Sequence, residues 1–227
     1  MKIMPIAFFG ICITVGLSFH APLVSAADTP ELRNQLLSDP VIQKEVIGTA
    51  QMAGVIVKHP CPSMKFERRS TVVIYDPFDF DSSGVLTTGS WKETVDATGC
   101  GVSRVLNVFV NSEGDKAFHF TAIFPGDTHA SKLLQHDTID YVMDQVLTFG
   151  GAAEKDCGVH YIADTQFVAL DGPPPRPGGL RQPWHEIWTI ETCKKSYRLP
   201  IQFTPDSDGT SFKVDQKAIK VSALPLK

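Results

Sequence analysis

Two glutamates occupy equivalent places in a repeated motif, and their surroundings are compatible with acid–base chemistry. The segment Trp91-Lys92-Glu93 recurs as Trp184-His185-Glu186, and a cysteine follows each tryptophan nine positions later. Because side chains alternate between the two faces of a strand, each glutamate shares a face with its tryptophan. Burial without a partner disfavours the charged form of a carboxyl group and so raises its pKa. A raised pKa is common among catalytic acids.

The sequence supports two interpretations of Glu93 and Glu186. In the structural interpretation, both are partnered inside a sheet. If the two cysteines of the first copy face each other, Glu93 lies opposite Arg68 and can form an ion pair, whereas the same register places Glu186 opposite Asp164. In the catalytic interpretation, the two glutamates meet as the carboxylate pair of a glycosidase-like hydrolase. We favour the structural interpretation and retain a secreted hydrolase as the alternative.

The N-terminus has the pattern of a secretory signal peptide. Lys2 precedes an apolar run from Ile3 to Phe19, and Val24-Ser25-Ala26 supplies small residues before a cleavage point. A membrane anchor would need about 20 uninterrupted apolar residues. We therefore expect residues 1–26 to be removed, which leaves a periplasmic or secreted protein with no membrane insertion.

Four cysteines follow this leader, namely Cys61, Cys100, Cys157 and Cys193. An even number in an exported chain is typical of disulfides. The repeat assigns one pair to each copy, Cys61 with Cys100 and Cys157 with Cys193. The alternative is one metal ion bound by all four thiolates, but the close Cys-x-x-Cys pairs typical of such sites are missing. We predict two disulfides and no metal site.

Two segments have the composition of binding loops. Residues 76–84 carry Phe78 and Phe80 among acidic residues, and exposed aromatic side chains are typical binding anchors. Residues 172–179 include Pro174, Pro175 and Arg176 in a stiff, extended stretch. In the alternative interpretation, the phenylalanines fold back under their loop and the prolines only limit strand pairing. Trp184 completes the predicted binding residues.

Other signatures of catalysis or cofactor binding are missing from the sequence. It has no Gly-x-Ser-x-Gly motif, phosphate-binding loop or dinucleotide-binding loop, and no histidine pair at a metal-ligand spacing. The formal net charge of -4 also argues against a nucleic-acid partner, which requires a basic surface. We expect no cofactor.

The similarity between the two copies extends beyond the Trp-x-Glu motif and predicts how it is positioned. Leu36, Cys61, Asp76 and Phe118 match Leu133, Cys157, Asp171 and Phe212 at offsets that drift between 94 and 97. Such a drifting offset indicates a duplicated folding unit. The predicted units are 27–125 and 126–227.

Each unit is predicted to contain two helices followed by four strands. Helix-start signals precede Pro30 and Pro40 in the first copy; in the second, a short segment at 129–135 precedes a helix that starts at Asp137 or Thr138 and ends at Gly150-Gly151. Strands are expected at 64–75, 86–97, 102–110, 116–124, 160–170, 182–192, 197–203 and 211–221. The fold class is therefore α+β, a tandem duplication of a two-helix plus four-stranded antiparallel meander with one disulfide per unit.

The layout of these elements resembles that of β-lactamase inhibitory proteins and, more loosely, of cystatins. The resemblance covers topology and no shared motif, so it implies no residue roles. We expect an exported, non-catalytic binding protein that contacts a protein or cell-envelope component through the 76–84 and 172–179 loops.

Overall fold

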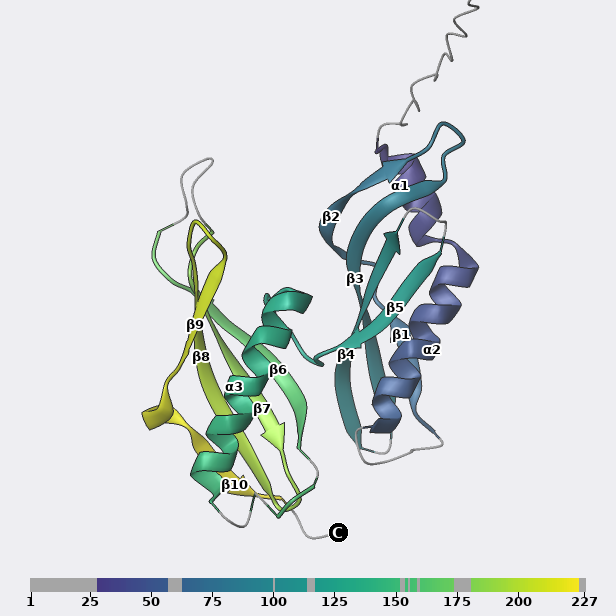
Figure 1. The fold of residues 1–227 in the computed structure, drawn as a ribbon. Helices are drawn as coiled ribbons and strands as arrows, with labels where there is room; N and C mark the ends of the chain where they lie inside the picture. Colours follow the sequence, from purple (N-terminus) through teal and green to yellow (C-terminus); the bar gives the residue numbers. More distant parts are fainter. Residues whose placement is uncertain are drawn as a thin grey trace, which may run out of the picture.

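The computed structural model describes residues 28–56, 63–99, 101–113, 117–151, 154, 156–158, 160–173 and 181–224. Within these ranges the chain forms two antiparallel sheets with helices beside them, which confirms a mixed α+β fold (Figure 1). The predicted signal peptide, Cys61, Cys100, Pro174, Pro175 and Arg176 lie outside the described residues. No described helix is long and apolar enough to cross a membrane.

The first half packs two helices against a five-stranded sheet. Helix α1 (Pro30–Leu37) is capped by Thr29 and leads into α2 (Pro40–Ile56). The strands are β1 (Lys65–Arg68), β2 (Val73–Phe80), β3 (Leu86–Gly99), β4 (Val102–Glu113) and β5 (Phe118–Ile123), in the order β1-β3-β4-β5 with β2 also paired to β3. Ile42, Val46 and Ala50 recur at helical spacing on α2 and enter the core that contains Trp91.

In the second half, the long helix α3 (Lys132–Gly150) packs against another five-stranded sheet. Its strands are β6 (Tyr161–Leu170), β7 (Trp184–Glu191), β8 (Lys195–Pro205), β9 (Thr210–Val214) and β10 (Lys220–Ala223), with the 3-10 helix η1 (Gln216–Ala218) before β10. The order is β10-β8-β7-β6, and β9 also pairs with β8. Trp188 and Phe203 lie at the centre of a separate core.

The second half differs from its predicted layout at the helix. The two predicted helical segments form one continuous helix, which begins after Ser131 because that side chain accepts a hydrogen bond from the Leu134 N–H. The helix ends as predicted, because Gly151 adopts a positive φ of 66°. The expectation of two helices in the second unit was therefore wrong.

The predicted four-stranded sheets also need correction, because each sheet has five strands. In the first half, the expected strand at 64–75 is interrupted between β1 and β2, where the Arg69 side chain pairs with Asp96. In the second half, the expected strand at 211–221 is divided by η1, since Asp215 caps that turn. Sequence periodicity locates the strands but does not show where a strand is broken.

The 76–84 segment is mostly strand, which corrects its assignment as a loop. β2 continues to Phe80 and pairs with β3 through several register shifts, one of them next to Pro77. Proline lacks an N–H, and it is accepted here because β2 is an edge strand with irregular pairing. The true turn covers residues 81–85, where the Asp81 carboxylate accepts the N–H groups of Ser83 and Val85.

The linker between the halves is hydrogen-bonded to both sheets. The Gly126 N–H donates to the Val105 carbonyl of β4 at 2.8 Å, while the Asp127 N–H donates to the Thr165 carbonyl of β6 at 2.7 Å. The Asn107 side-chain amide donates to the carbonyls of Phe124 and Gly126, each at 2.8 Å. The linker thus lies beside the β6 edge and connects the first sheet to the second through these hydrogen bonds.

Replacing Gly126 with alanine tests this close approach. Gly126 has a φ of 95°, and an added methyl group would lie 2.1 Å from the Thr165 carbonyl oxygen. Gly172 has a φ of 74°, but a methyl group there meets no described atom within 4 Å. We expect Gly126→Ala to lower the free energy of unfolding by about 1–3 kcal/mol more than Gly172→Ala, measured by urea unfolding. Equal losses would contradict this packing.

Candidate functional site

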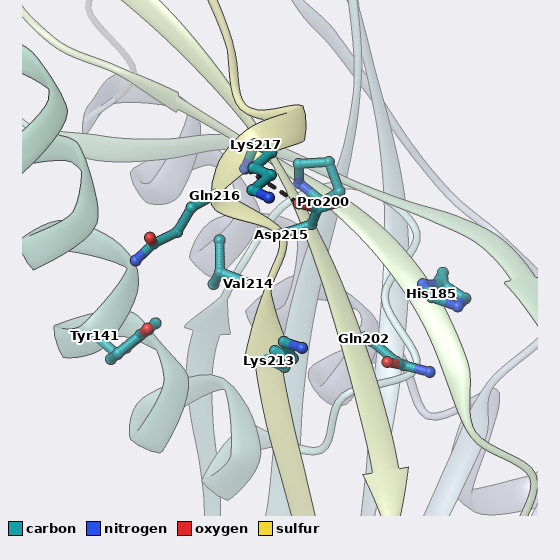
Figure 2. Close-up of a pocket in the computed structure, with 9 residues that line it drawn as sticks. All are labelled: Tyr141, His185, Pro200, Gln202, Lys213, Val214, Asp215, Gln216 and Lys217. Carbon is teal, nitrogen blue, oxygen red and sulfur yellow. Dashed lines mark hydrogen bonds between the residues drawn. The ribbon is translucent and has the colours of Figure 1, made fainter.

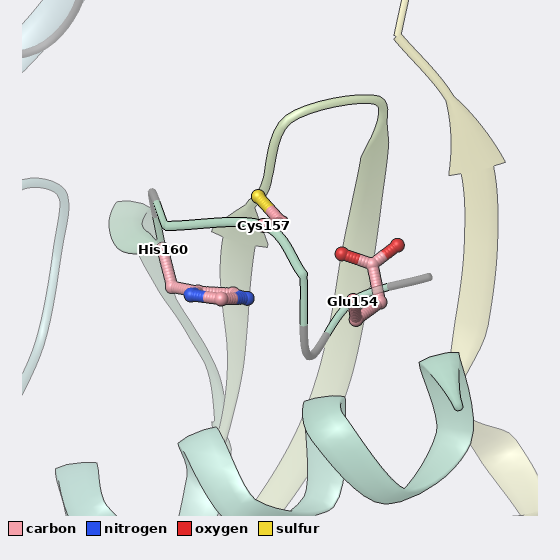
Figure 3. A group of neighbouring side chains, drawn as sticks. All are labelled: Glu154, Cys157 and His160. Carbon is pink, nitrogen blue, oxygen red and sulfur yellow. The ribbon is translucent and has the colours of Figure 1, made fainter. Parts of the chain in front are cut away.

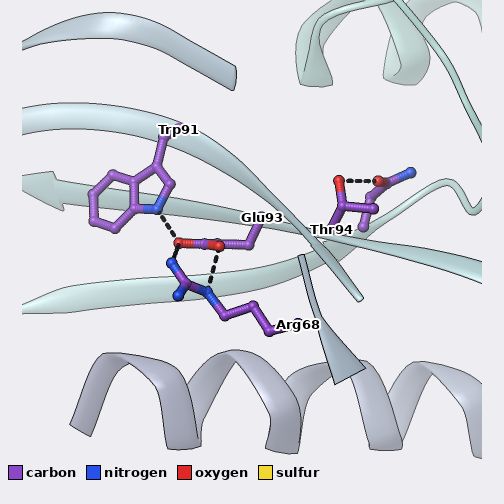
Figure 4. A network of polar contacts seen from close by, with 5 residues as sticks. Arg68, Trp91, Glu93 and Thr94 are labelled. Carbon is purple, nitrogen blue, oxygen red and sulfur yellow. Dashed lines mark hydrogen bonds and ion pairs between the residues drawn. The ribbon is translucent and has the colours of Figure 1, made fainter. Parts of the chain in front are cut away.

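Glu93 is fully buried and is partnered by both a cation and an indole. Arg68 donates to its two carboxylate oxygens at 2.7 and 2.8 Å, and Trp91 Nε1 donates at 2.7 Å (Figure 4). The predicted ion pair is therefore confirmed. The register differs from the predicted one, because Arg68 lies opposite Val95 and reaches Glu93 diagonally.

Glu186 is equally buried, but among the described residues no Lys, Arg or His side chain forms an ion pair with it. Its carboxylate accepts four hydrogen bonds, from Trp184 Nε1 (2.8 Å), Trp188 Nε1 (2.7 Å), Thr128 Oγ1 (2.8 Å) and the backbone N–H of His129 (2.8 Å). Donors of this number can stabilise a buried carboxylate. Two of them belong to the linker, so Glu186 ties the linker to the second sheet.

The predicted neighbour of Glu186 was wrong. Glu186 lies opposite Phe167, while Asp164 lies opposite Thr189, because β6 is shifted by irregularities at two points. Phe167 also stacks on the ring of His129, with the ring centroids 4.0 Å apart. The polar and aromatic contacts therefore fix the same stretch of linker.

The two glutamates do not form the carboxylate pair of the catalytic interpretation. Glu93 is bonded to Trp91 in the first core, and Glu186 is bonded to Trp188 in the second. In each, both carboxylate oxygens already accept hydrogen bonds and neither side chain is exposed. This arrangement favours the structural interpretation over a hydrolase that uses these residues.

A pocket of about 460 Å³ lies where the two halves and the linker meet. It is lined by Val73, Ile74, Tyr75 and Lys92 of the first half, Asp127, Thr128 and His129 of the linker, and Leu170, Arg181, Gln182 and Trp184 of the second half. Lys92 Nζ donates to the Thr128 carbonyl at 3.1 Å. A continuous set of contacts therefore runs from Lys92 through Thr128 to Glu186.

Burial changes the pKa values of two side chains in this pocket. Burial lowers the pKa of Lys92, although the charges of Asp127 and Glu186 act in the opposite direction. Burial also raises the pKa of the Tyr75 hydroxyl to about 12, with a further contribution from the Glu186 charge. Sequence reasoning missed both residues; the available signal for Lys92 was its place between the tryptophan and glutamate of a repeated motif.

Some of the predicted binding residues lie in a hydrophobic core, and others line the pocket between the halves. Phe78 and Phe80 are buried in the first core, where the Phe78 ring packs edge-on against Trp91, so they are not the exposed anchors we expected. Trp184 is also buried, yet it lines the pocket between the halves. Leu170 and Arg181, on either side of the proline-rich segment, line the same pocket.

The predicted Cys157–Cys193 disulfide is present, with the two Cα atoms 5.8 Å apart. Glu154 and His160 lie near it, and the three ligand-type atoms are within 4.8 Å of one another (Figure 3). The Cys157 sulfur is bonded to Cys193 and is not a thiolate, so the group offers two metal ligands rather than three. Glu154 forms an ion pair at 3.6 Å with Lys195.

A second pocket, of about 620 Å³, lies on the second half beside η1 (Figure 2). His185 and Gln202 line it. His185 Nε2 lies 2.6 Å from the Asp171 carboxylate, and the Gln202 amide donates to the same carboxylate at 3.1 Å. Asp171 directly precedes the proline-rich segment. These contacts therefore hold one end of that segment against the sheet.

Comparison of the chain with protein families, curated proteins and solved structures found no match. The topological resemblance to β-lactamase inhibitory proteins and cystatins gains no support from these comparisons.

Replacing Glu186 with glutamine tests its structural role. The amide presents one acceptor oxygen to four donors, so two donors lose their partner. We expect the free energy of unfolding to fall by roughly 2–5 kcal/mol in urea unfolding. Glu67→Gln, on an exposed position of β1, should change it by less than about 0.5 kcal/mol. An unchanged stability in Glu186→Gln would show that the carboxylate is not a structural centre.

Three tyrosines are expected to titrate late in the folded protein. Burial is the main cause that raises the pKa values of Tyr75, Tyr161 and Tyr197 to about 12 from an ordinary value of 10.0. Their stabilising contribution is complete below pH 10.0 and is lost as the pH rises towards 12. Phenolate absorbance should therefore rise at lower pH in urea-unfolded protein than in folded protein. Coincident titration curves would contradict the burial of these hydroxyls.

Proposed function

We propose that the protein is an exported, non-catalytic binding protein that contacts a protein or cell-envelope component. The main support for this proposal is the pocket between the halves, which combines apolar and charged side chains and includes Leu170 and Arg181 from either side of the proline-rich segment. Ligand sites commonly occupy such boundaries between folding units. The saturated hydrogen bonding of Glu93 and Glu186 supports a non-catalytic role for these two residues.

Export to the periplasm or the medium is supported by two independent features. The N-terminal sequence has the pattern of a signal peptide, and Cys157 is bonded to Cys193. Disulfides of this kind are typical of oxidising compartments. The second predicted disulfide, Cys61–Cys100, belongs to the same proposal.

We also propose that the halves arose by tandem duplication. In each, the tryptophan Nε1 of a central strand donates to the glutamate two residues later, at 2.7 Å for Trp91 and 2.8 Å for Trp184. The strand series β3-β4-β5 and β7-β8-β9 pair in the same antiparallel sense. The helical layers differ, which is compatible with divergence after duplication.

The binding surface is expected to include the pocket mouth and the 172–179 segment. The 76–84 segment would contribute its exposed carboxylates, Asp76 and Asp79, rather than its buried aromatic rings. Both carboxylates line a separate, shallow pocket of about 390 Å³ beside Phe109.

Capture from an envelope or culture extract tests the proposal with charge substitutions at matched exposed positions. Val73 and Leu170 lie at the pocket, whereas Val41 and Val221 are similarly exposed elsewhere. We expect Val73→Asp and Leu170→Asp to reduce recovery of a cross-linked partner at least tenfold. Val41→Asp and Val221→Asp should leave recovery unchanged, because each adds the same charge away from the site. Equal recovery by all four variants would contradict a binding surface at this pocket.

A further inference from the structure

Lys92 carries a largely buried ammonium group in the wall of the pocket. Lys92 is only 7% exposed, and its Nζ donates to the backbone carbonyl of Thr128. Among the described residues, no carboxylate forms an ion pair with it. A lysine ammonium has three N–H donors, so it can bind an acceptor that enters the pocket while keeping its bond to Thr128.

The apolar part of the pocket is contributed by both halves. Val73 is 48% exposed and Leu170 is 52% exposed, so both side chains are accessible to a ligand. They line the same pocket, with Ile74 and Trp184 also in its wall. An apolar side chain of a ligand would therefore remove apolar surface of the protein from water on both sides.

The first-half wall of the pocket is made of consecutive residues of an edge strand. Val73, Ile74 and Tyr75 belong to β2, and among the described strands β2 pairs only with β3. The outer edge of such a strand can accept the backbone of an extended peptide. A free fatty acid has no backbone groups to use this edge.

Size and charge limit the ligand further. A volume of about 460 Å³ is within the range of sites that hold a small molecule or a few residues of a peptide. The lining has two basic side chains, Lys92 and Arg181, and one carboxylate, Asp127. The lining therefore favours an anionic group on the ligand.

From these observations we propose that the pocket binds the carboxyl terminus of a peptide whose last residue is apolar, with the terminal carboxylate on Lys92. The apolar side chain lies between Val73 and Leu170, and the peptide backbone runs along the outer edge of β2. The inference rests on the proposed binding function and names the chemistry of its partner.

Calorimetric titration of the full mature protein tests the inference with defined probes. The probes are acetyl-Ala-Ala-Leu with a free carboxylate, the same peptide as its C-terminal amide, and octanoate. We expect the free acid to bind at least tenfold more tightly than the amide and than octanoate. Equal binding of acid and amide, stronger binding of octanoate, or no binding of any probe would overturn the inference.

Substitutions at lysine provide the matched control. Lys92→Met keeps the length of the side chain and removes its charge, so it should weaken binding of the free acid at least tenfold. Lys213→Met makes the same change at an exposed position on β9 and should leave binding unchanged. Wild-type affinity in Lys92→Met would overturn the inference. If Lys92→Met does not fold, Val73→Asp at the exposed mouth decides: it should weaken the free acid at least tenfold, and an unchanged affinity would overturn the inference.

These results are separable from those of the extract capture. A partner whose recovery depends on Val73 and Leu170, combined with failure of the peptide probes, would remove the proposed ligand chemistry and leave the binding function standing. Peptide binding without capture from any extract would support the ligand chemistry and contradict an envelope or secreted partner in that extract.

Discussion

A carboxylate buried in an apolar core needs donors supplied by the protein, and this requirement organises the second half of the molecule. Glu186 obtains two donors from its own strand and two from the linker. The linker is therefore drawn onto the sheet at Thr128 and His129, immediately before α3 begins. Because Lys92 donates to Thr128, the same constraint sets where the first half meets the second and so where their shared pocket lies.

The glutamate of the Trp-x-Glu motif has different partners in the two halves. In the first, Arg68 supplies the charge that balances Glu93, and the network stays within one sheet. In the second, neutral donors from outside the sheet take that place. The motif thus stabilises a single sheet in the first half and holds the linker on the sheet in the second. Because the linker is held on the second sheet, its backbone at Thr128 lies beside Lys92 of the first half, and both residues line the pocket.

Several features of this arrangement were predictable from sequence and others were not. Alternation along 86–97 and 182–192 located the central strands, the repeat paired Cys157 with Cys193, and residue spacing brought Arg68 to Glu93. The burial of Phe78 and Phe80 was foreseen only as the alternative to exposed anchors. The strand that buries them was not predicted, because Pro77 and three acidic residues are typical of a loop, whereas an edge strand tolerates irregular pairing. The two linker donors to Glu186 come from positions 57 and 58 residues away, a separation that strand periodicity cannot detect.

Native-state hydrogen exchange at the donors to Glu186, followed by NMR, tests directly whether this carboxylate holds the linker on the second sheet. The backbone N–H of His129 lies in a linker, where exchange is ordinarily fast, but here it is bonded to a fully buried carboxylate. We expect it to exchange as slowly as the Trp184 and Trp188 indole N–H groups, in one cooperative opening. Exchange of the His129 N–H at the rate of an open loop, with both indoles still protected, would contradict it.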